Sequence, residues 1–137
     1  MFLPVVRRQE LEHREKVEEV IDFLGLQHYR DQFVRSLPYG VRKVVELARA
    51  LATEPKLLML DEPSSGLNVE ETQDMAFWIK DIRQQLGITL LMVEHDMKLV
   101  ADVSDRVLAL NDGRVIAEGP PSSVQDNVDV VKAYLGE

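Results

Sequence analysis

Two short apolar segments, each followed by polar residues and then by a helical pattern, are the feature that most constrains the fold of this chain. The first covers residues 56–60 and ends at Asp61, and the second covers Ile88–Val93 and ends at Glu94. Apolar runs of this length are typical of strands that are buried on both faces of a parallel sheet. Two successive units of strand and helix therefore predict an α/β fold with a parallel sheet and flanking helices.

The spacing of apolar residues predicts helices on either side of these strands. Gly25 and Gly87 follow two of the helical patterns as stop signals, and Asn68 with Glu71 has the spacing of a capping box at a helix start. The expected helices are Glu10–Leu24 with Leu11, Val17, Val20, Ile21 and Leu24 on one face, Tyr39–Ala52, a helix after Asn68 with Met75, Ile79, Ile82 and Leu86 on its apolar face, and Met97–Val103.

The C-terminal segment has the pattern of a β-hairpin followed by a helix. Asn111-Asp112-Gly113 is typical of a hairpin turn, and it separates apolar segments at residues 106–110 and 114–118. A last helix is expected around Val128–Leu135. The fold class is thus α/β, with a C-terminal hairpin and helix added to the parallel sheet.

Composition excludes several classes of protein. The chain has 24 acidic and 16 basic residues and a net charge of -8, which argues against nucleic acid as a partner. It contains no cysteine, so disulfides and thiolate metal sites are excluded, and a cytoplasmic location is expected. Its apolar runs are far shorter than the ~20 residues that a membrane-spanning helix needs.

Asp61 and Glu62, directly after the first apolar segment, are the strongest candidates for catalysis. A strand that delivers a carboxylate to the edge of a sheet can place it beside a Mg²⁺ ion and nucleotide phosphates. The adjacent carboxylate can then act as a general base on an attacking water. A strand that merely ends in two solvated acids before Pro63 would give the same local sequence.

Further motifs occur in the order found in ABC-type ATPases, and with them the chain resembles that family. Residues 57–63 resemble its Walker B strand, residues 64–68 its D-loop, and His95 its switch histidine after the next strand. Residues 36–43 stand where the family keeps its signature motif, at the start of a helix that continues into Ala48-Arg49-Ala50-Leu51. Each motif alone is weak, but their order makes the resemblance specific.

The resemblance implies a role for each motif. Asp61 would hold Mg²⁺ through water, Glu62 would be the general base, and His95 would sense the γ-phosphate of ATP. The signature motif would contact ATP held by a partner subunit, because the N–H groups of a helix N-terminus attract phosphate oxygens. The residues implied to touch ATP are Leu37, Pro38, Tyr39, Gly40 and Val41 in the signature motif and Ser65, Gly66, Leu67 and Asn68 in the D-loop.

Within this family the chain looks most similar to the ATPases of branched-chain amino acid importers. The Tyr39-Gly40 pair, the Gly-Leu-Asn sequence of the D-loop and the segment at residues 130–136 carry that similarity. Pro38 replaces a serine and Val41 a glutamine of the usual signature, which removes two polar contacts with ATP. The serine is also absent from this branch and from the related lipopolysaccharide exporters, so Val41 is the clearer departure.

No Gly-x-x-x-x-Gly-Lys-Ser/Thr sequence, the Walker A loop that cradles the β- and γ-phosphates, occurs in the 137 residues. The resemblance therefore implies a partial P-loop NTPase domain without its P-loop strand. Residues 1–52 would end the helical subdomain, and residues 53–137 would run from Walker B to the C-terminus. We expect a fragment that is inactive alone. Either the strand at 106–110 closes against the strand at 88–93 and leaves apolar surface exposed, or another chain supplies the missing strand.

Two classes of function remain open at this point. The first is the ATPase subunit of an ABC transporter, which uses ATP and Mg²⁺, pairs with the same or a related subunit, and docks on a transmembrane permease through residues 10–34 at the inner face of the cell membrane. The second is a non-catalytic interaction module, which the missing Walker A loop favours and the retained Asp61, Glu62 and His95 oppose. Lipopolysaccharide export is the alternative to amino acid import. An ABC ATPase of DNA repair or translation fits the acidic charge poorly.

Overall fold

The computed structural model describes residues 4–135, and the fold is α/β, as predicted. The chain divides into two compact units. One comprises the residues up to Leu60 together with Ile82–Leu91, and the other comprises Asp61–Asp81 and the residues from Met92 onward. Among residues 4–135, none of the helices is both long enough and apolar enough to cross a membrane.

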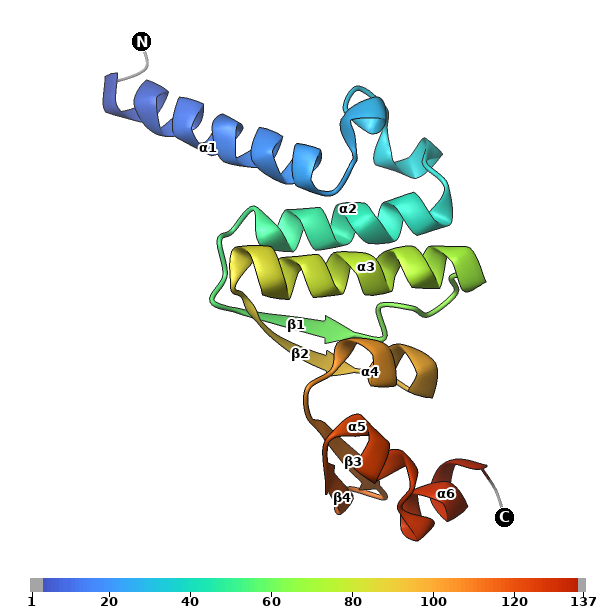
Figure 1. The fold of residues 1–137 in the computed structure, drawn as a ribbon. Coiled ribbons are helices and arrows are strands. Elements are labelled where there is room, and N and C mark those ends of the chain that lie inside the picture. The colour runs from blue at the N-terminus through green and yellow to red at the C-terminus, as the bar shows by residue number, and fades with distance from the viewer. Residues whose placement is uncertain (1–3, 136–137) are drawn as a thin grey trace. The chain divides into compact units, whose positions relative to one another are not determined.

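The first unit opens with helix α1 (Pro4–Phe23), which leads through the 3-10 turns η1 (Gln27–Tyr29) and η2 (Val34–Ser36) into helix α2 (Tyr39–Leu51) (Figure 1). Helix α1 begins earlier than predicted, because a proline is well tolerated at a first helical position, where no backbone donor is needed. The ion pair between Arg8 and Glu12, at 2.9 Å and spaced i, i+4, supports this added part.

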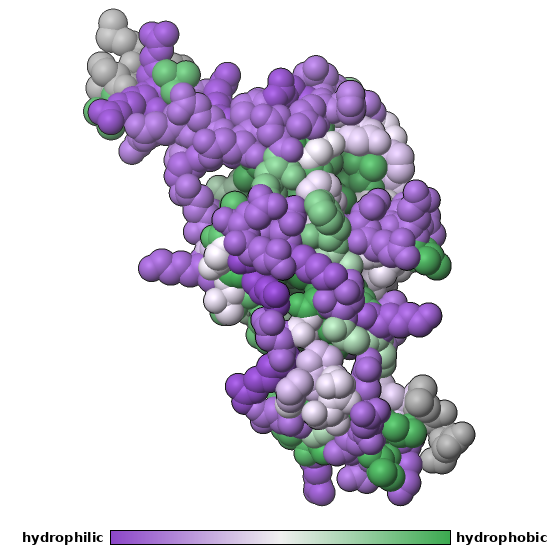
Figure 2. All heavy atoms as spheres, in the orientation of Figure 1, coloured by the Kyte–Doolittle hydropathy of each residue, from purple (hydrophilic) through white to green (hydrophobic). Residues whose placement is uncertain are grey.

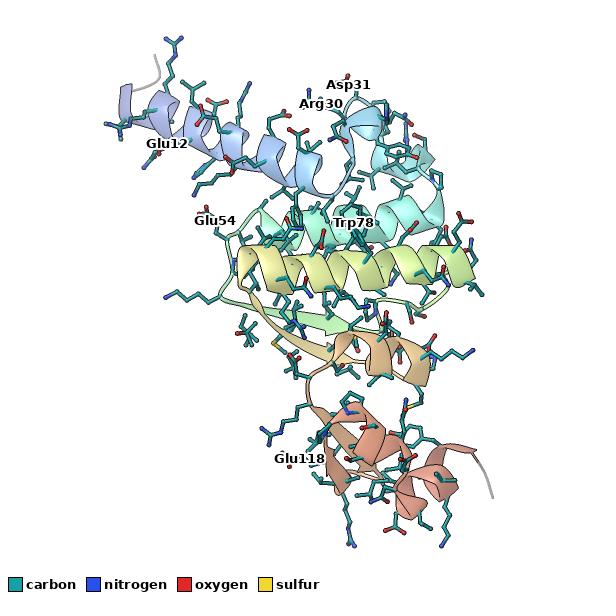
Figure 3. All side chains as sticks on the ribbon, viewed as in Figure 1. Glu12, Arg30, Asp31, Glu54, Trp78 and Glu118 are labelled. Carbon is teal, nitrogen blue, oxygen red and sulfur yellow. The ribbon has the colours of Figure 1, made fainter. Side chains whose placement is uncertain are left out.

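The apolar face predicted for α1 is only partly formed. Leu24, just after the helix, is buried, whereas Leu11 and Val17 are exposed. The surface of α1 in Figure 2 is almost entirely hydrophilic, as its many charged residues require. Ion pairs join Lys16 to Glu54 and Glu18 to Arg30, with Glu54 and Arg30 labelled in Figure 3. They are largely exposed, so each adds at most about 1 kcal/mol of stability.

Strands β1 (Leu57–Asp61) and β2 (Thr89–Val93) form a two-stranded sheet. The Thr89 amide donates to the Lys56 carbonyl at 3.1 Å, and the Glu62 amide donates to the Val93 carbonyl at 2.9 Å. These two bonds follow the same order along both strands, so the strands run parallel, as predicted. Their C-terminal ends therefore open at the same edge of the sheet, and helix α3 (Val69–Leu86) makes the crossover between them.

The prediction that both strands are buried on both faces is wrong for the described residues. Leu58 is buried, but its neighbours Leu57 and Met59 are 51% and 69% exposed. Strand β2 likewise exposes Leu91 and Val93. Alternate side chains of a strand point to opposite faces, and within residues 4–135 only one of the two faces is covered. The continuous apolar sequences of β1 and β2 nevertheless provide apolar side chains for both faces of this sheet.

The predicted capping box opens helix α3. The Asn68 side chain accepts from the Glu71 amide at 2.9 Å, and the Glu71 carboxylate accepts from the Asn68 amide at 2.9 Å. Gly87, with φ of +65°, follows the helix in the left-handed conformation that glycine favours. On the predicted apolar face Met75, Ile79 and Ile82 are buried, while Leu86 in the last turn is exposed, contrary to expectation.

The second unit ends in a hairpin with helices packed on it. Helix α4 (Met97–Val103) precedes strands β3 (Val107–Asn111) and β4 (Arg114–Gly119), which pair antiparallel around Asp112 and Gly113, with φ of +47° and +75°. The short helix α5 (Pro121–Gln125), which was not predicted, and helix α6 (Val128–Leu135) follow (Figure 1). Ala109, Val124 and Val130 form the core of this part.

Strands β3 and β4 form a sheet of their own. The alternative in which the strand at residues 106–110 closes against the strand at residues 88–93 is therefore wrong for the described residues. The hairpin keeps its pairing because the two-residue turn fixes its register locally.

Of the C-terminal segment that carries the family resemblance, Gly136 lies outside the described residues.

We expect Ile82→Ala to lower the free energy of unfolding by about 2–5 kcal/mol, because its side chain is 0% exposed and truncation leaves a cavity. Leu86→Ala, on the same helix but 46% exposed, should cost less than about 1 kcal/mol. Urea unfolding followed by circular dichroism measures both. Equal losses would contradict the assignment of Ile82 to the core and Leu86 to the surface.

Candidate active site

The acidic pair lies at the edge of the parallel sheet, as the sequence predicts. Asp61 is the last residue of β1, and Glu62 follows with φ of +43°, a left-handed conformation that is uncommon outside glycine. The backbone of Glu62 is held there, because its amide donates to the Val93 carbonyl at the end of β2. Both carboxyl groups lie on exposed residues and are open to a ligand.

His95 lies beside Glu62, although the two residues come from the ends of different strands. The His95 Nδ1 atom is 3.8 Å from a carboxyl oxygen of Glu62, and the two side chains are 69% and 51% exposed. This separation is longer than a hydrogen bond but short enough for both groups to face one small ligand. The structure thus brings together two of the residues that the sequence singles out, and their roles stay predictions.

Glu94 is the residue of this site that sequence analysis missed. Its side chain is 0% exposed, whereas the sequence reads as a polar strand end with Glu94, His95 and Asp96 alike. The carboxylate accepts hydrogen bonds from both the amide and the hydroxyl of Ser64 and from the amides of His95 and Asp96. No local signal marks this burial, because Ser64 is 30 residues away in the sequence.

These bonds keep Glu94 ionised. Burial by itself would raise the pKa of its carboxyl, but the bonds from the Ser64 hydroxyl and amide and from the Asp96 and His95 amides outweigh burial and hold the pKa below its ordinary value of 4.5. A buried charge is tolerated when donors surround it in this way.

The segment predicted to be the D-loop is a compact turn. The Ser65 amide donates to the Glu62 carbonyl at 3.1 Å and the Leu67 amide to the Ser64 carbonyl at 3.0 Å, while Gly66 has φ of +77°. Asn68 ends the turn, and its side-chain oxygen is engaged in the capping box of α3. The turn is thus fixed at both ends, by Glu62 and by α3.

The signature motif lies in the first unit, at the N-terminus of α2. Leu37 and Gly40 are buried, and Pro38 occupies the cap position without a side-chain hydrogen bond. The Arg42 amide donates to the Pro38 carbonyl at 3.0 Å, so the helix begins within this motif. Val41 is half-buried and offers no polar side chain there.

Tyr39, in the same motif, is flanked by two cations. The Arg42 guanidinium lies 5.4 Å and the Lys43 ammonium 6.0 Å from the centre of its ring, both within cation–π range. They add positive charge to the positive end of the helix dipole. These charges give this end of α2 the electrostatic character of an anion site, and contact between the signature motif and ATP stays a prediction.

Among residues 4–135, no group of three or more His, Cys, Asp or Glu side chains is arranged so that it could hold a metal ion. A single carboxylate is nevertheless enough to fit Mg²⁺ bound to a nucleotide, because that ion keeps several waters and takes its other ligands from phosphates. Asp61 is accessible for that purpose at the end of β1. The residues present thus fit a shared ion and do not fit a site made by the protein alone.

Two family comparisons agree with these motifs. The family described as ABC transporter matches residues 2–65, which include the signature motif, Asp61 and Glu62. The family described as branched-chain amino acid ATP-binding cassette transporter matches residues 114–137, from β4 to the C-terminus.

Individual relatives match nearly the whole chain. The high-affinity branched-chain amino acid transport ATP-binding protein BraF of Pseudomonas aeruginosa is 41% identical over 98% of this chain and 52% of its own length. The protein LivG of Escherichia coli, of the same description, is 39% identical over the same shares. The crystal structure of the ADP conformation of MJ1267, an ATP-binding cassette of an ABC transporter, has a TM-score of 0.84 at 33% identity, over 92% of this chain and 51% of its own. The chain spans about half the length of these relatives.

We expect Glu94→Gln to lower the free energy of unfolding at neutral pH by about 1–3 kcal/mol, because buried donors lose their acceptor. The difference from the unsubstituted chain should shrink as the pH falls. A depressed folded-state pKa gives stability that is present above the unfolded value of 4.5 and is lost as the pH falls through the lower folded value. Urea titrations across this acid range measure the effect, and a difference that stays constant would contradict it.

Proposed function

Because the chain belongs to the ATP-binding domains of ABC transporters, of which it spans about half, we propose that it carries the hydrolytic side of an ATP site. The observation that carries this proposal is the 3.8 Å approach of His95 to Glu62 at the edge where two parallel strands end. Ligands of α/β proteins bind at such edges. The retained pair favours an ATPase over a non-catalytic interaction module.

In this proposal Glu62, His95 and Asp61 have three different roles, which follow from where each residue lies. The exposed Glu62 carboxylate orients and polarises the water that attacks the γ-phosphate, and the His95 ring, on the adjacent strand end, hydrogen-bonds the γ-phosphate. Asp61 would hold Mg²⁺ through water, and that ion, when bound, neutralises charge on the phosphate oxygens. The bond from the Glu62 amide to Val93 keeps the base in place while the phosphate binds.

The signature motif serves a second ATP, held by a partner subunit. The amides at the start of α2, with Gly40 allowing a close approach and Arg42 and Lys43 nearby, suit phosphate oxygens. Pro38 and Val41 supply no polar side chain, so the contact would rest on backbone and charge. Residues 65–68 would line the same interface between subunits.

The Walker A loop that cradles the β- and γ-phosphates would come from residues outside this sequence, because the 137 residues contain none. The chain by itself would then hydrolyse no ATP. With the cradle supplied, the complete domain would dimerise, dock on a transmembrane permease through the region of residues 10–34 at the inner face of the membrane, and energise uptake of branched-chain amino acids. The names of the relatives support that substrate.

A hybrid tests the proposal: the part of the Pseudomonas aeruginosa relative that contains its Walker A loop is joined to the N-terminus of this chain. We expect Mg²⁺-dependent ATP hydrolysis by the hybrid and none by the 137-residue chain. Glu62→Gln in the hybrid should lower kcat by at least about 100-fold with little change in ATP binding, because it removes the general base and keeps the side-chain volume. Phosphate release and calorimetry provide the two measurements.

Glu118→Gln is the matched control, because it makes the same chemical change on β4, where Glu118 pairs only with Arg106 among the described contacts (Figure 3). It should leave hydrolysis unchanged. Hydrolysis by the 137-residue chain, or hydrolysis by the hybrid that survives Glu62→Gln, would refute the proposal.

A further inference from the structure

The buried Glu94 carboxylate takes no part in the mechanism proposed above, yet it is the most completely enclosed charge described in the site. Its side chain is 0% exposed and directly precedes His95. A buried carboxylate is costly unless donors satisfy it, so its presence here calls for a specific arrangement of donors.

The two oxygens of Glu94 bind two different loops. One oxygen accepts from the Ser64 amide, at 2.9 Å, and from the Ser64 hydroxyl, in the turn after β1. The other accepts from the His95 amide at 2.9 Å and from the Asp96 amide at 3.3 Å, in the turn after β2. One rigid, planar group therefore fixes the separation of the two turns.

Each turn lies next to one of the two residues that are proposed to face the ligand, Glu62 and His95. Ser64 is two residues beyond Glu62, with the buried Pro63 between them, and His95 is adjacent to Glu94. Glu62 has the uncommon φ of +43°, which persists only where its surroundings hold it. The Glu62 amide is bonded on one side to Val93, and the Ser64 bond fixes the chain on the other.

Asp96 extends the same arrangement to helix α4. Its side chain accepts from the Lys98 and Leu99 amides at 2.9 and 3.1 Å and caps the helix, while its own amide donates to Glu94. The turn that carries His95 is thus anchored at one end to β2 and at the other to α4. Only a carboxylate can accept from all four donors, because a glutamine side chain would turn an amide group toward one set of them.

We propose that Glu94 is a positioning residue that sets the distance between Glu62 and His95 by bonding the turn after β1 to the turn after β2. The proposal rests on the proposed function of those two residues. The negative charge of Glu94 is needed to hold the two turns in this arrangement. The four donors converge on its carboxylate and lose their common acceptor when Glu94 is replaced. Neither Ser64 nor Glu94 contacts ATP in this arrangement; both act through the residues that do.

Two measurements on Glu94→Gln test it. In the 137-residue chain, NMR hydrogen exchange at the Ser64 and His95 amides should speed up by a factor at least about tenfold larger than in β3 and β4, because these two amides lose their acceptor in addition to any loss of global stability. In the hybrid, kcat should fall about 10–100-fold while the KM for ATP stays within about threefold, since misplacement near the reacting groups affects the transition state more than binding. Ser64→Ala should lower kcat by a smaller factor than Glu94→Gln. Ser64→Thr, which keeps the hydroxyl, should retain the activity that Ser64→Ala loses.

The outcomes separate this proposal from the proposed function. Unchanged exchange at Ser64 and His95, or an active hybrid in which Glu94→Gln leaves kcat unchanged, overturns the positioning role and leaves the ATPase assignment standing. An equal acceleration of exchange in β3 and β4, or an equal loss of kcat in Glu118→Gln, also overturns it, because either result indicates general destabilisation. An unsubstituted hybrid without hydrolysis refutes the ATPase assignment, and the exchange data then decide whether Glu94 holds the two turns.

Discussion

Parallel pairing of β1 with β2 is the constraint on which the rest of the site depends. Two parallel strands end at one edge, and the loops that follow them must then share a small volume. The crossover by α3 makes this pairing possible, and its own start is fixed by the reciprocal bonds of Asn68 and Glu71. The chemistry-bearing residues lie close together because each of them follows a strand that ends at this edge.

Such an edge places acidic side chains close together, and the structure separates them by environment. The Glu62 side chain is exposed and the Glu94 side chain is enclosed, although both residues lie just beyond a strand end. Exposure leaves Glu62 available to a ligand. Burial among four donors makes Glu94 an ionised structural centre with a lowered pKa. Two residues of the same type thus differ in what they can do because of their donors.

Much of this arrangement could be predicted from the sequence where the signal is local. The capping box at Asn68, the hairpin turn at Asp112-Gly113 and the strand that delivers Asp61 each depend on a few neighbouring residues, and each is present. Burial of Glu94 and exposure of Leu86 could not be predicted, because they depend on residues distant in sequence. The early start of α1 and helix α5 show that helix ends are also fixed weakly by local pattern.

The motifs predicted to bind ATP are a different case. Their residues occupy turns and a helix start of the expected kind, but Leu37–Val41 and Asp61–Glu62 belong to separate compact units. The family resemblance implies that these residues act on different nucleotides, because the signature motif would contact ATP held by a partner subunit. Their roles toward ATP stay predictions.

The division of the strands into two separate pairs has a consequence for the behaviour of the chain in solution. In a two-stranded sheet every strand is an edge strand, with one side of its backbone able to pair with another chain. Strand β1 adds exposed Leu57 and Met59 to that open edge. A net charge of -8 opposes association between copies, so the tendency of the purified chain to aggregate should increase with salt, which screens that repulsion.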